Sequence, residues 1–583
     1  MNKKNKMNEK SLNIGFTLNL VIAFLFCFNY VQAEDKLLNI LNEGLNYEFN
    51  ELKQEETPPY YIEYRVSDYY MDLVNSSFGS LTKSDNTHSR FVNIVVKVGD
   101  YKFDNTHKYT DEEAASDYNY NFSTILPLDN NETAIKQILW WYTNKAYLNA
   151  LSIYKSINEQ DKSKQKNSKK RLDDFSIESP SHYYEEPLDN IEFNRSKWEK
   201  DLKEISAMFL NDTSVIDGNA SVNSIHERKY LVNSEGTSVV QNVTYSQLQI
   251  TSTLRNNKGN AIPVLKSYVS KLPEGLPSKI DIMNDMEDMF STMKDFKTCT
   301  TAEPYSGPAI LSSDAAGVFF HEIFGHRIEG HRLKDESDAQ TFKEMIGSKV
   351  LPKTFNVYFD PREEKVGNTD LIGHYVYDDE GVKSQKVDIV ENGILKTFLM
   401  SRTPVEGLSK SNGHGRAQTG YEPVARQSNM FIKSNDPLSD EALRKKLIKT
   451  CKSKGLKYGY YFKTVYGGFT YTTRYMPNVF NIFPLEVYRI YVDGRPDELV
   501  RGVELIGTPL AMFSEIEAAG NTYNVFNGFC GAESGMVPVS TIAPAIFVKK
   551  VETQSQPNVY INVPILKMPV ANDINIQNKE EAK

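Results

Sequence analysis

The chain lacks the excess of basic residues that marks nucleic-acid-binding proteins. Lys and Arg number 67 against 76 Asp and Glu, so the formal net charge is −9. Because the phosphates of nucleic acids are bound by a basic protein face, this balance gives no reason to expect a nucleic-acid partner. Peptides and small molecules remain open as ligands.

The apolar run at the N-terminus is too short to span a bilayer. It reads GFTLNLVIAFLFCF over residues 15–28, whereas a spanning helix needs about 20 residues. Four lysines precede it, and VQA follows it, ending at Ala33. This order is typical of a secretory signal peptide, so we expect residues 1–33 to be removed. The protein would then be periplasmic or extracellular, without a stable membrane span; an uncleaved anchor is the alternative.

Cysteine is scarce, with four residues in the whole chain. Cys27 lies in the expected signal peptide, which leaves Cys299, Cys451 and Cys530 in the mature chain. An odd number in an oxidising compartment permits one disulfide at most and leaves one thiol for another role.

Apolar residues are plentiful, and their periodicity divides the chain. With 583 residues, 40% of them hydrophobic, the chain can bury large cores and is long enough for two to four domains. Helical spacing of apolar residues at 34–52, 132–157 and 194–210 predicts three helices. We expect the second of them to bury Trp140, Trp141, Tyr147, Leu148 and Leu151.

Strand patterns lie between these helices. Alternating or apolar runs at 58–66, 71–82 and 89–103 predict a meander, and residues 226–254 predict a hairpin that turns at Asn233–Gly236. Residues 158–187 are charged and lack apolar periodicity, which indicates a solvated connection or loop. Together, residues 34–255 predict an N-terminal α/β domain with helices packed on a sheet.

The second half has a different pattern. Residues 256–300 predict a connecting helical segment, whose methionines at helical spacing are expected to pack in a core. From 301 to 555, turn signals between alternating strands predict a β-rich C-terminal domain with one central helix, for which Ser313 or Asp314 is the expected N-cap. Residues 556–583 form a tail. The expected fold class is therefore α+β.

The central helix carries FFHEIFGHRIEGH at residues 319–331, with three of the nine histidines. His321 and His326 are five residues apart, which rotates them by about 140° around an ideal helix, so their side chains would diverge. They converge on one metal ion only if the helix is distorted, for which Gly325 is the natural position. Glu322 could then act as the general base. The alternative is an ordinary helix, with histidines bonded in the core and Glu322 and Glu329 paired with Arg327 or Arg332.

A third metal ligand must come from elsewhere in the sequence. Cys530 lies between Gly528 and Gly531, where a thiolate could approach a metal closely. It could equally be a small buried side chain. Glu329 and His331 are rival candidates for the same role.

These motifs resemble those of the TldD/PmbA family. HEIFGHRIEGH is similar to the family's HExxxH signature, and YDDEGVKSQKVDIVENGILKTFLMSR (377–402) to its DDEG and IENGxL turns. NGHGRA (412–417), the GGF at 467 and the stretch from VRGVELIGTPLAMF (500–513) through FCGAESGMVPVSTIAPAIFVKKV (529–551) resemble further family segments. Several motifs in the family's order are far more specific than HExxxH alone.

The resemblance implies a zinc-dependent peptidase. It makes His321, His326 and Cys530 the ligands of one zinc ion per chain and Glu322 the catalytic carboxylate. It also implies a fold of the expected kind, a homodimer or a heterodimer with a family relative, and peptides that bind as an added strand. The family's better-known members are cytoplasmic, whereas this chain is expected to be exported, and segment 158–187 is longer and more charged than the family pattern.

Two further residues are candidates for substrate contact. His414 and Arg416, in NGHGRA, could each steady a peptide carbonyl or a developing oxyanion, or could instead support the turn. We therefore expect an exported zinc metallopeptidase that hydrolyses peptides or unfolded polypeptide segments. The alternatives are a non-catalytic peptide-binding or assembly protein of the same fold, and a zinc hydrolase of a non-peptide amide.

Overall fold

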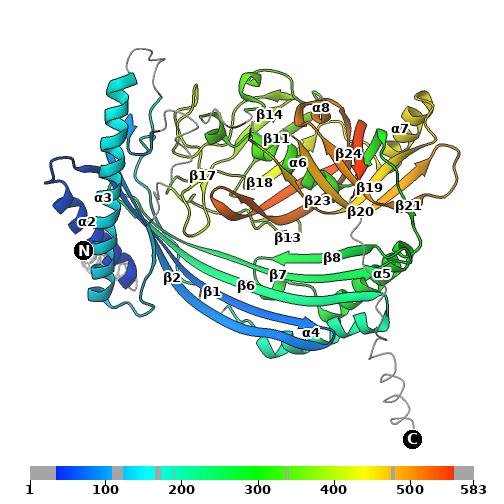
Figure 1. The fold of residues 1–583 in the computed structure, drawn as a ribbon, viewed down its shortest axis with the longest axis horizontal. Helices are drawn as coiled ribbons and strands as arrows, with labels where there is room; N and C mark the ends of the chain where they lie inside the picture. Colours follow the sequence, from blue (N-terminus) through cyan, green and yellow to red (C-terminus); the bar gives the residue numbers. More distant parts are fainter. Residues whose placement is uncertain are drawn as a thin grey trace, which may run out of the picture.

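Two large β-sheets, each with its own helices, make up the computed structural model (Figure 1). The structure describes residues 35–107, 122–164, 172–188, 191–334, 338, 340–473 and 479–556. The predicted signal peptide and all of the predicted tail except residue 556 lie outside these residues. The α+β fold class and the β-rich character of the C-terminal half are confirmed.

The first sheet has eight strands, ordered β3-β2-β1-β6-β7-β5, with β4 paired to β2 and β8 to β7. Its strands are β1 (Pro59–Ser77), β2 (Ser80–Asp100), β3 (Phe103–Asp104), β4 (Phe122–Ile125), β5 (His182–Tyr184), β6 (Val215–Asn233), β7 (Ser238–Arg255) and β8 (Ala261–Ser270). The hairpin predicted at Asn233–Gly236 is present, with Gly236 at φ 100°.

The predicted three-strand meander is wrong: residues 59–100 form one long hairpin. The expected strand at 71–82 spans the turn, because Phe78 and Gly79 both take positive φ there (46° and 85°). Residues 71–77 continue β1, which pairs with β6 on its other side along its length. A turn of only two residues is compatible with a run that otherwise looks like a continuous strand.

Four helices cover one face of this sheet (Figure 1). They are α2 (Lys36–Leu52), α3 (Glu132–Lys164), α4 (Arg195–Ala207) and α5 (Lys279–Phe296). Residues 256–300, predicted as a connecting helical segment, contribute both β8 and α5 to this layer. Three of the four methionines of α5 are buried in a core shared with α4, as predicted: Met286, Met289 and Met293 are at most 3% exposed, whereas Met283 is half-buried.

Helix α3 turns its two tryptophans outward, contrary to the sequence prediction. Trp140 is 45% exposed, Trp141 48% and Leu148 54%, whereas Tyr147 is buried. The face formed by Ile135, Leu139, Ala146, Ala150 and Ile153 packs against α2 and the sheet. Because only one side of the helix is covered, residues about 100° away from that face remain exposed.

Part of the charged segment 158–187 is ordered between the two halves of the molecule. Helix α3 extends to Lys164, and Phe175 is buried under the guanidinium of Arg402, 3.9 Å from its carbon to the ring centroid. Arg402 also pairs with Glu235, and β5 runs parallel to β7. Residues 172–188 therefore connect the first sheet to the C-terminal half of the molecule and are not a free solvated loop.

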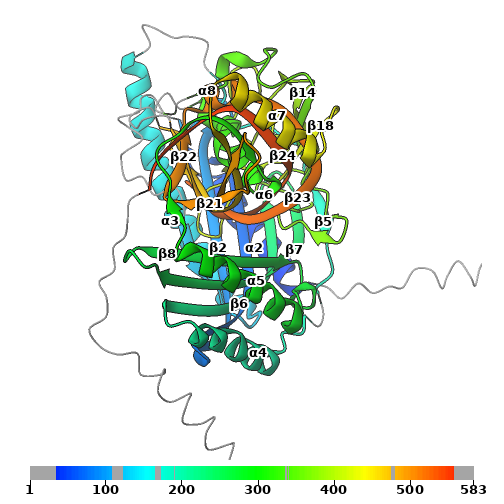
Figure 2. The same cartoon turned by 90° about the vertical axis from the view of Figure 1, so that its right-hand side faces the viewer.

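The second sheet has twelve strands and curves around helix α6 (Ser313–Ile323), as Figure 2 shows. Its order is β15-β14-β11-β18-β24-β10-β19-β20-β21-β9, with β22 paired to β20 and β24, and β23 to β24. The strands are β9 (Thr300–Thr301), β10 (Ser306–Leu311), β11 (Phe355–Phe359), β14 (Val387–Glu391), β15 (Ile394–Leu395), β18 (Asn429–Ser434), β19 (Tyr458–Thr470), β20 (Phe480–Tyr491), β21 (Glu498–Arg501), β22 (Val503–Gly507), β23 (Ile516–Ala532) and β24 (Gly535–Ser555).

Smaller elements complete this half. Two short strand pairs are β12 (Lys365–Val366) with β13 (Thr369–Asp370), and β16 (Gly415–Arg416) with β17 (Val424–Ala425). Helix α7 (Asp440–Ser453) packs on the side of the sheet away from the main core, whereas α8 (Pro509–Ser514) contributes Met512 and Phe513 to the core around α6 (Figure 1). Helix α6 is buried from Ala315 to Ile323, so it forms the centre of the C-terminal core.

Two observations bear on the chain's surroundings. Within the described residues, no helix has the length and apolar character needed to cross a membrane. Cys299, Cys451 and Cys530 are all free thiols in this structure.

Candidate metal centre

The structure brings together the three side chains predicted as metal ligands. One ligand atom each from His321, His326 and Cys530 lies within 4.8 Å of the others, and all three residues are buried. Cys530 Sγ is 3.4 Å from His326 Nε2, and the two imidazole rings are 5.0 Å apart between centroids. Among groups of His, Cys, Asp and Glu side chains in the described part of the chain, this is the one whose geometry could hold a metal ion.

The two histidines converge because helix α6 ends between them. The prediction of a single helix through both is wrong: α6 stops at Ile323, and Phe324 (φ −112°, ψ −52°) leads into the 3₁₀ turn Gly325–Arg327. The expected distortion near Gly325 is therefore present as a change of helix type. A Cβ atom on Gly325 would lie 1.9 Å from Gln427 Oε1, so any other residue here would displace the buried Gln427 side chain.

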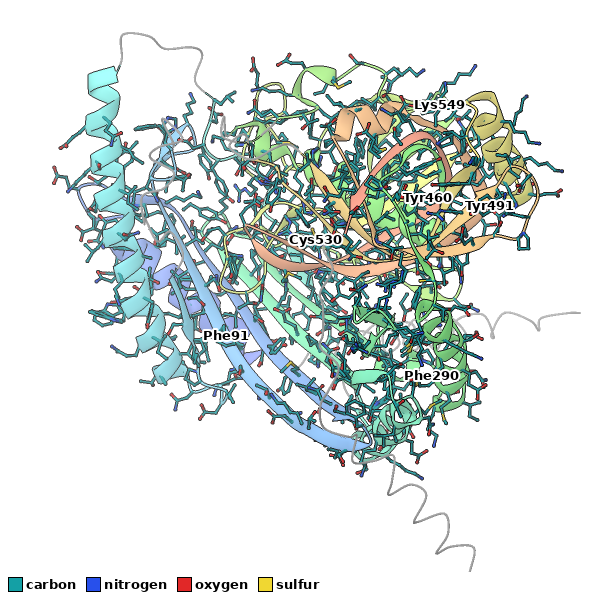
Figure 3. The ribbon with its side chains drawn as sticks, turned by 45° about the vertical axis from the view of Figure 1, so that its right-hand side comes forward. Phe91, Phe290, Tyr460, Tyr491, Cys530 and Lys549 are labelled. Atoms are coloured by element: carbon teal, nitrogen blue, oxygen red, sulfur yellow. The ribbon has the colours of Figure 1, made fainter. Side chains whose placement is uncertain are left out.

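Cys530 lies close to the histidines in space although it is about 200 residues away in sequence, near the C-terminal end of the domain. It lies on β23 opposite Val537 of β24, in the hairpin that passes over the N-terminal sheet (Figure 3). Arg426 Nη2 donates to the Cys530 carbonyl over 2.6 Å, which holds the strand against the core. The thiol thus sits on a fixed strand and not on a mobile loop.

The chemistry of these donors fits a metal ion. His321 Nδ1 is buried and has no hydrogen-bond partner among the described residues, which is costly for a polar atom unless something else binds it. Burial by itself raises the pKa of the Cys530 thiol, but His326 and His321 lower it well below its usual range, so the thiolate is favoured. Histidine nitrogens and a cysteine thiolate are donors that zinc binds, and three protein ligands leave a fourth position for substrate or water, as in catalytic zinc sites.

A buried carboxylate orients His326. Glu329 is fully buried, and its Oε2 lies 3.3 Å from His326 Nδ1, which directs Nε2 toward the thiol. Arg332 donates to the same oxygen over 3.0 and 2.8 Å, and Arg426 Nε is 3.5 Å from Oε1. Although burial raises the pKa of Glu329, His326 and Arg332 lower it to about 2. A carboxylate behind a ligand histidine is a common feature of metal sites.

The two rival ligands lie outside the cluster. Glu329 contacts the second nitrogen of His326, and His331 pairs with Glu533 at the surface side of the site. The structure therefore groups Cys530, and neither rival, with the two histidines.

Glu322 lies next to the ligands and is 7% exposed. Burial raises the pKa of its carboxyl group, an effect that His321 and His326 partly oppose. Gly468 of β19 makes room for it, because a Cβ there would be 2.8 Å from Glu322 Cγ. Arg327 donates to the Glu322 carbonyl over 2.8 Å and to the Tyr471 carbonyl over 3.1 Å, so it ties the end of α6 to the end of β19.

His414 and Arg416 do not join the cluster. His414 is fully buried, its Nε2 lies 3.1 Å from Ser428 Oγ, and burial lowers its pKa to about 3. Arg416 Nη1 donates to the carbonyls of Gln427 and Pro538. Both side chains thus support the surrounding turns, and only Arg416 lines a cavity.

Gln427 and Arg426 contribute to the site without having been predicted. Gln427 Nε2 donates to the His321 carbonyl over 3.4 Å, 106 residues away in sequence, and Arg426 holds both Glu329 and Cys530. No local pattern marks these residues. The sequence did single out Gly468, as the second glycine of the GGF motif. Its contact with Glu322 could not be predicted, because it depends on the packing of β19 on α6.

Residues 304–555 match the family model described as the PmbA/TldA metallopeptidase C-terminal domain. A metalloprotease of Methanocaldococcus jannaschii is 32% identical over 231 residues, covering 40% of this chain and 47% of the relative. A protein of Saccharolobus solfataricus named zinc metalloprotease TldD homolog is 28% identical over 247 residues, covering 42% of this chain and 51% of the relative. The chain thus matches about half the length of these curated relatives.

Solved structures extend the likeness to the whole fold. TldE from Thermococcus kodakarensis superposes with a TM-score of 0.60 at 13% identity, over 88% of this chain and 100% of that one. A structure from Thermotoga maritima gives 0.59 at 16% identity with the same coverage. At these identities the likeness concerns the fold alone.

Proposed function

Because residues 304–555 belong to the TldD/PmbA family, we propose that the protein is a zinc-dependent metallopeptidase that hydrolyses peptides or unfolded polypeptide segments. The resemblance found in the sequence is thereby confirmed at the level of the family. The observation that carries the proposal is the grouping of His321, His326 and Cys530 within 4.8 Å, directly beside Glu322.

In this proposal His321, His326 and Cys530 hold one zinc ion. Zinc bound there supplies Lewis-acid chemistry, by which water becomes a nucleophile near neutral pH and a peptide carbonyl becomes more electrophilic. Glu329 fixes the ring of His326, and Arg332 and Arg426 keep the Glu329 carboxylate charged and in place. The ligands are thus oriented before substrate binds.

Glu322 moves the proton. Arg327 donates to the backbone carbonyl of Glu322, and the Glu322 carboxylate accepts a proton from the attacking water. Its raised pKa brings it closer to neutrality, where a carboxyl group can both accept this proton and pass it to the leaving amine. No side chain is acylated in this scheme.

Substrate would bind along an open strand edge. Strand β23, which carries Cys530, pairs with β24 and with no other strand among the described residues. A peptide in extended conformation can add to such an edge through main-chain hydrogen bonds, which gives affinity with little dependence on sequence.

The decisive experiment combines metal content and turnover in wild-type protein and Glu322→Gln. We expect about one zinc per chain in both proteins, and cleavage of a mixed-peptide digest, read by mass spectrometry, by the wild type alone. Glu344→Gln, an exposed carboxylate of the same domain, is the matched control and should cleave normally. Zinc retention without any cleavage by the wild type would instead favour the non-catalytic binding protein or an enzyme with a non-peptide amide substrate.

We further propose that the chain acts as a dimer with a second copy or a family relative, and that it is exported. The first proposal is supported by the shared fold of this chain and a structure named TldE. The second is supported by the lysine-rich start and apolar run of residues 1–33. Light scattering on the purified protein tests the first, and N-terminal sequencing of protein recovered outside the cytoplasm tests the second.

A further inference from the structure

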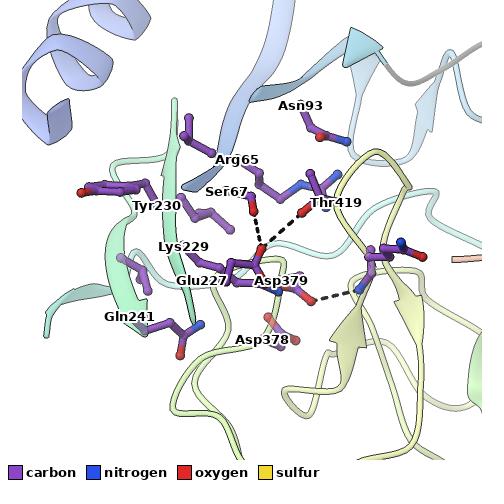
Figure 4. A pocket seen from close by; sticks show the side chains of 15 residues that line it. Arg65, Ser67, Asn93, Glu227, Lys229, Tyr230, Gln241, Asp378, Asp379 and Thr419 are labelled. Atoms are coloured by element: carbon purple, nitrogen blue, oxygen red, sulfur yellow. Dashed lines mark hydrogen bonds and ion pairs between the residues drawn. The ribbon is translucent and has the colours of Figure 1, made fainter. Parts of the chain in front are cut away.

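A cavity of about 480 Å³ lies between the N-terminal sheet and the C-terminal domain. Strands β1, β2, β6 and β7 form one wall, while residues 374, 375, 377, 379, 416–419, 529 and 536–538 form the other. None of the proposed zinc ligands lines it. A smaller polar recess, shown in Figure 4, opens beside it and shares Ser67, Glu227, Lys229 and Asp379 with it.

Aromatic rings form much of the cavity wall. Tyr245 and Phe529 approach one another across the domain boundary, with ring centroids 4.9 Å apart, and Tyr69, Phe91 and Tyr375 add further ring surface. The volume lies within the range of sites for small organic ligands, and such sites are common where two domains meet. An apolar or aromatic side chain of a ligand would be well accommodated.

Glu227 is the anionic group available to a ligand. Its Oε1 accepts from Ser67 Oγ over 2.5 Å and from Thr419 Oγ1 over 3.2 Å (Figure 4). Its second oxygen has no hydrogen-bond partner among the described residues. The neighbouring Asp379 is already engaged, since Lys229 and the backbone of Ala417 donate to its two oxygens. The positive charge of Lys229 is balanced by this ion pair with Asp379.

Arg416 is the cationic group available to a ligand. Its Nη1 is used twice, for the carbonyls of Gln427 and Pro538, and its guanidinium carbon lies 4.8 Å from the centroid of the Tyr375 ring. A guanidinium has five N–H donors, and those on Nε and Nη2 make no hydrogen bond to the described residues. Such a pair of donors matches the two oxygens of a carboxylate.

We propose that this cavity binds a short peptide with free ends. Its ammonium group would lie on Glu227, its carboxylate on Arg416, and an apolar or aromatic side chain between the rings. None of the proposed zinc ligands lines this site, although Phe529 and Val537 in its wall are neighbours of Cys530. The source of its ligand rests on the proposed function, because short peptides with free ends are what a peptidase releases.

Binding of three related probes tests the proposal. The zinc-loaded Glu322→Gln protein is titrated calorimetrically with glycyl-tyrosine, its N-acetyl form and its C-terminal amide. We expect glycyl-tyrosine to bind at least tenfold more tightly than either capped form, because each cap removes one charge-assisted hydrogen bond. Equal binding of all three probes would overturn the proposal.

Two variants locate the binding. Adding Glu227→Gln should weaken glycyl-tyrosine at least tenfold and leave the N-acetyl form unchanged, whereas Glu199→Gln on α4, outside the cavity, should alter neither. Val243→Trp, which fills the cavity from β7, should abolish binding while circular dichroism stays native. If Glu227→Gln and Val243→Trp both bind glycyl-tyrosine normally, the cavity is not the site.

Removal of zinc separates this proposal from the peptidase proposal. Binding in the cavity should persist in metal-free protein, because no zinc ligand lines it. Loss of binding on metal removal would place the probe at the metal centre and overturn the cavity proposal. Failure of the protein to cleave peptides would overturn the proposed function and leave this binding measurement intact.

Discussion

Single residues at the metal centre have distinct tasks that substitution can separate. His321, His326 and Cys530 offer the donor atoms, Glu322 lies beside them, and Glu329 lies behind His326. Two of the surrounding positions, Gly468 and Gly325, matter for what they lack, because a methyl group at either one would collide with Glu322 or Gln427. The variants below test the second and third of these tasks.

Gly468→Ala should lower turnover while leaving the metal in place. The added methyl group would lie 2.8 Å from Glu322 Cγ and 3.1 Å from the Asn481 carbonyl, so the carboxylate must move. Because displacement of a catalytic group by about 1 Å costs roughly 100-fold in rate, we expect kcat to fall between tenfold and 100-fold. Steady-state kinetics and zinc analysis check this. Thr470→Ala on the same strand is the control. An unchanged kcat in Gly468→Ala would refute the claim that Gly468 leaves the room that Glu322 needs.

Glu329→Gln should weaken metal binding. The substitution keeps the shape but removes the charge that fixes His326 Nδ1 and pairs with Arg332 and Arg426. Loss of such a supporting carboxylate typically costs 10- to 100-fold in metal affinity, and chelator competition measures it. Glu533→Gln, which alters a half-exposed partner of the same Arg332, should change affinity far less. Equal effects in the two variants would mean that Glu329 does not act through His326.

At the scale of elements, the start and end of α6 place the site. Its N-cap is Ser312, one residue before the predicted candidates Ser313 and Asp314. Ser312 Oγ accepts from Ala315 N over 3.1 Å and donates to the Lys463 carbonyl over 2.7 Å, so one hydroxyl both caps the helix and ties it to β19. The break after Ile323 then sets where His326 lies.

Ser312→Ala should destabilise the protein by about 1 kcal/mol, the usual cost of losing an N-cap. Urea unfolding measures the change. Ser312→Asp keeps an acceptor for the helix and should recover most of the stability, although it cannot donate to Lys463. If the Ala and Asp variants are equally unstable, the bond to Lys463 matters and the cap does not.

Elements with local signals could be predicted from the sequence, whereas those that depend on packing could not. The helices α2 and α4 and the turn at Asn233–Gly236 follow from apolar spacing and turn residues. The continuity of β1 across residues 67–70, the pairing of β8 with β7 and the outward position of Trp140 and Trp141 depend on neighbours far away in sequence.

The candidate site divides in the same way. The pattern HEIFGH pointed to two ligands and required a distortion near Gly325, and the family resemblance pointed to Cys530. The support from Gln427 and Arg426 comes from the segment between β17 and β18, about 100 residues away from the groups that it holds, which no periodicity reveals.

At the scale of the whole molecule, buried charges lie along the boundary between the two halves. Arg402 is 1% exposed and pairs with Glu235 of the turn between β6 and β7, and the DDEG turn inserts Asp378, Asp379 and Glu380 beside it. Asp379 is paired with Lys229 across the boundary. Asp378 and Glu380 form no ion pair among the described residues. Burial raises the pKa of Asp378 to about 7, and burial together with the neighbouring Asp378 raises that of Glu380 well above its usual range, an effect that Arg402 partly opposes.

The contribution of these two carboxyl groups to stability should therefore fall as pH rises from about 4.5 toward 7. The unfolded chain releases the protons of Asp378 and Glu380 near their usual values of 3.8 and 4.5, whereas the folded protein retains them until higher pH. Each retained proton costs about 1.4 kcal/mol per pH unit in this window. In Glu380→Gln the slope of unfolding free energy against pH should be smaller by about one proton.

Urea unfolding at pH 5, 6 and 7 measures these slopes. Glu391→Gln, at an exposed position on β14, is the control and should keep the wild-type slope. Parallel slopes for wild type and Glu380→Gln would show that Glu380 does not hold a proton in the folded protein.

The three tryptophans of the chain all lie in the N-terminal half: two are exposed on α3 and Trp198 is buried on α4 at 4% exposure. Intrinsic fluorescence excited at the indole band therefore reports on the first sheet and its helices, and residues 301–583 contribute no indole emission. Opening of the metal centre should leave the tryptophan fluorescence unchanged, whereas the circular dichroism of the tyrosines should change. A tryptophan introduced by Met536→Trp, at the rim of the inter-domain cavity, would give the second half a fluorescent reporter of its own.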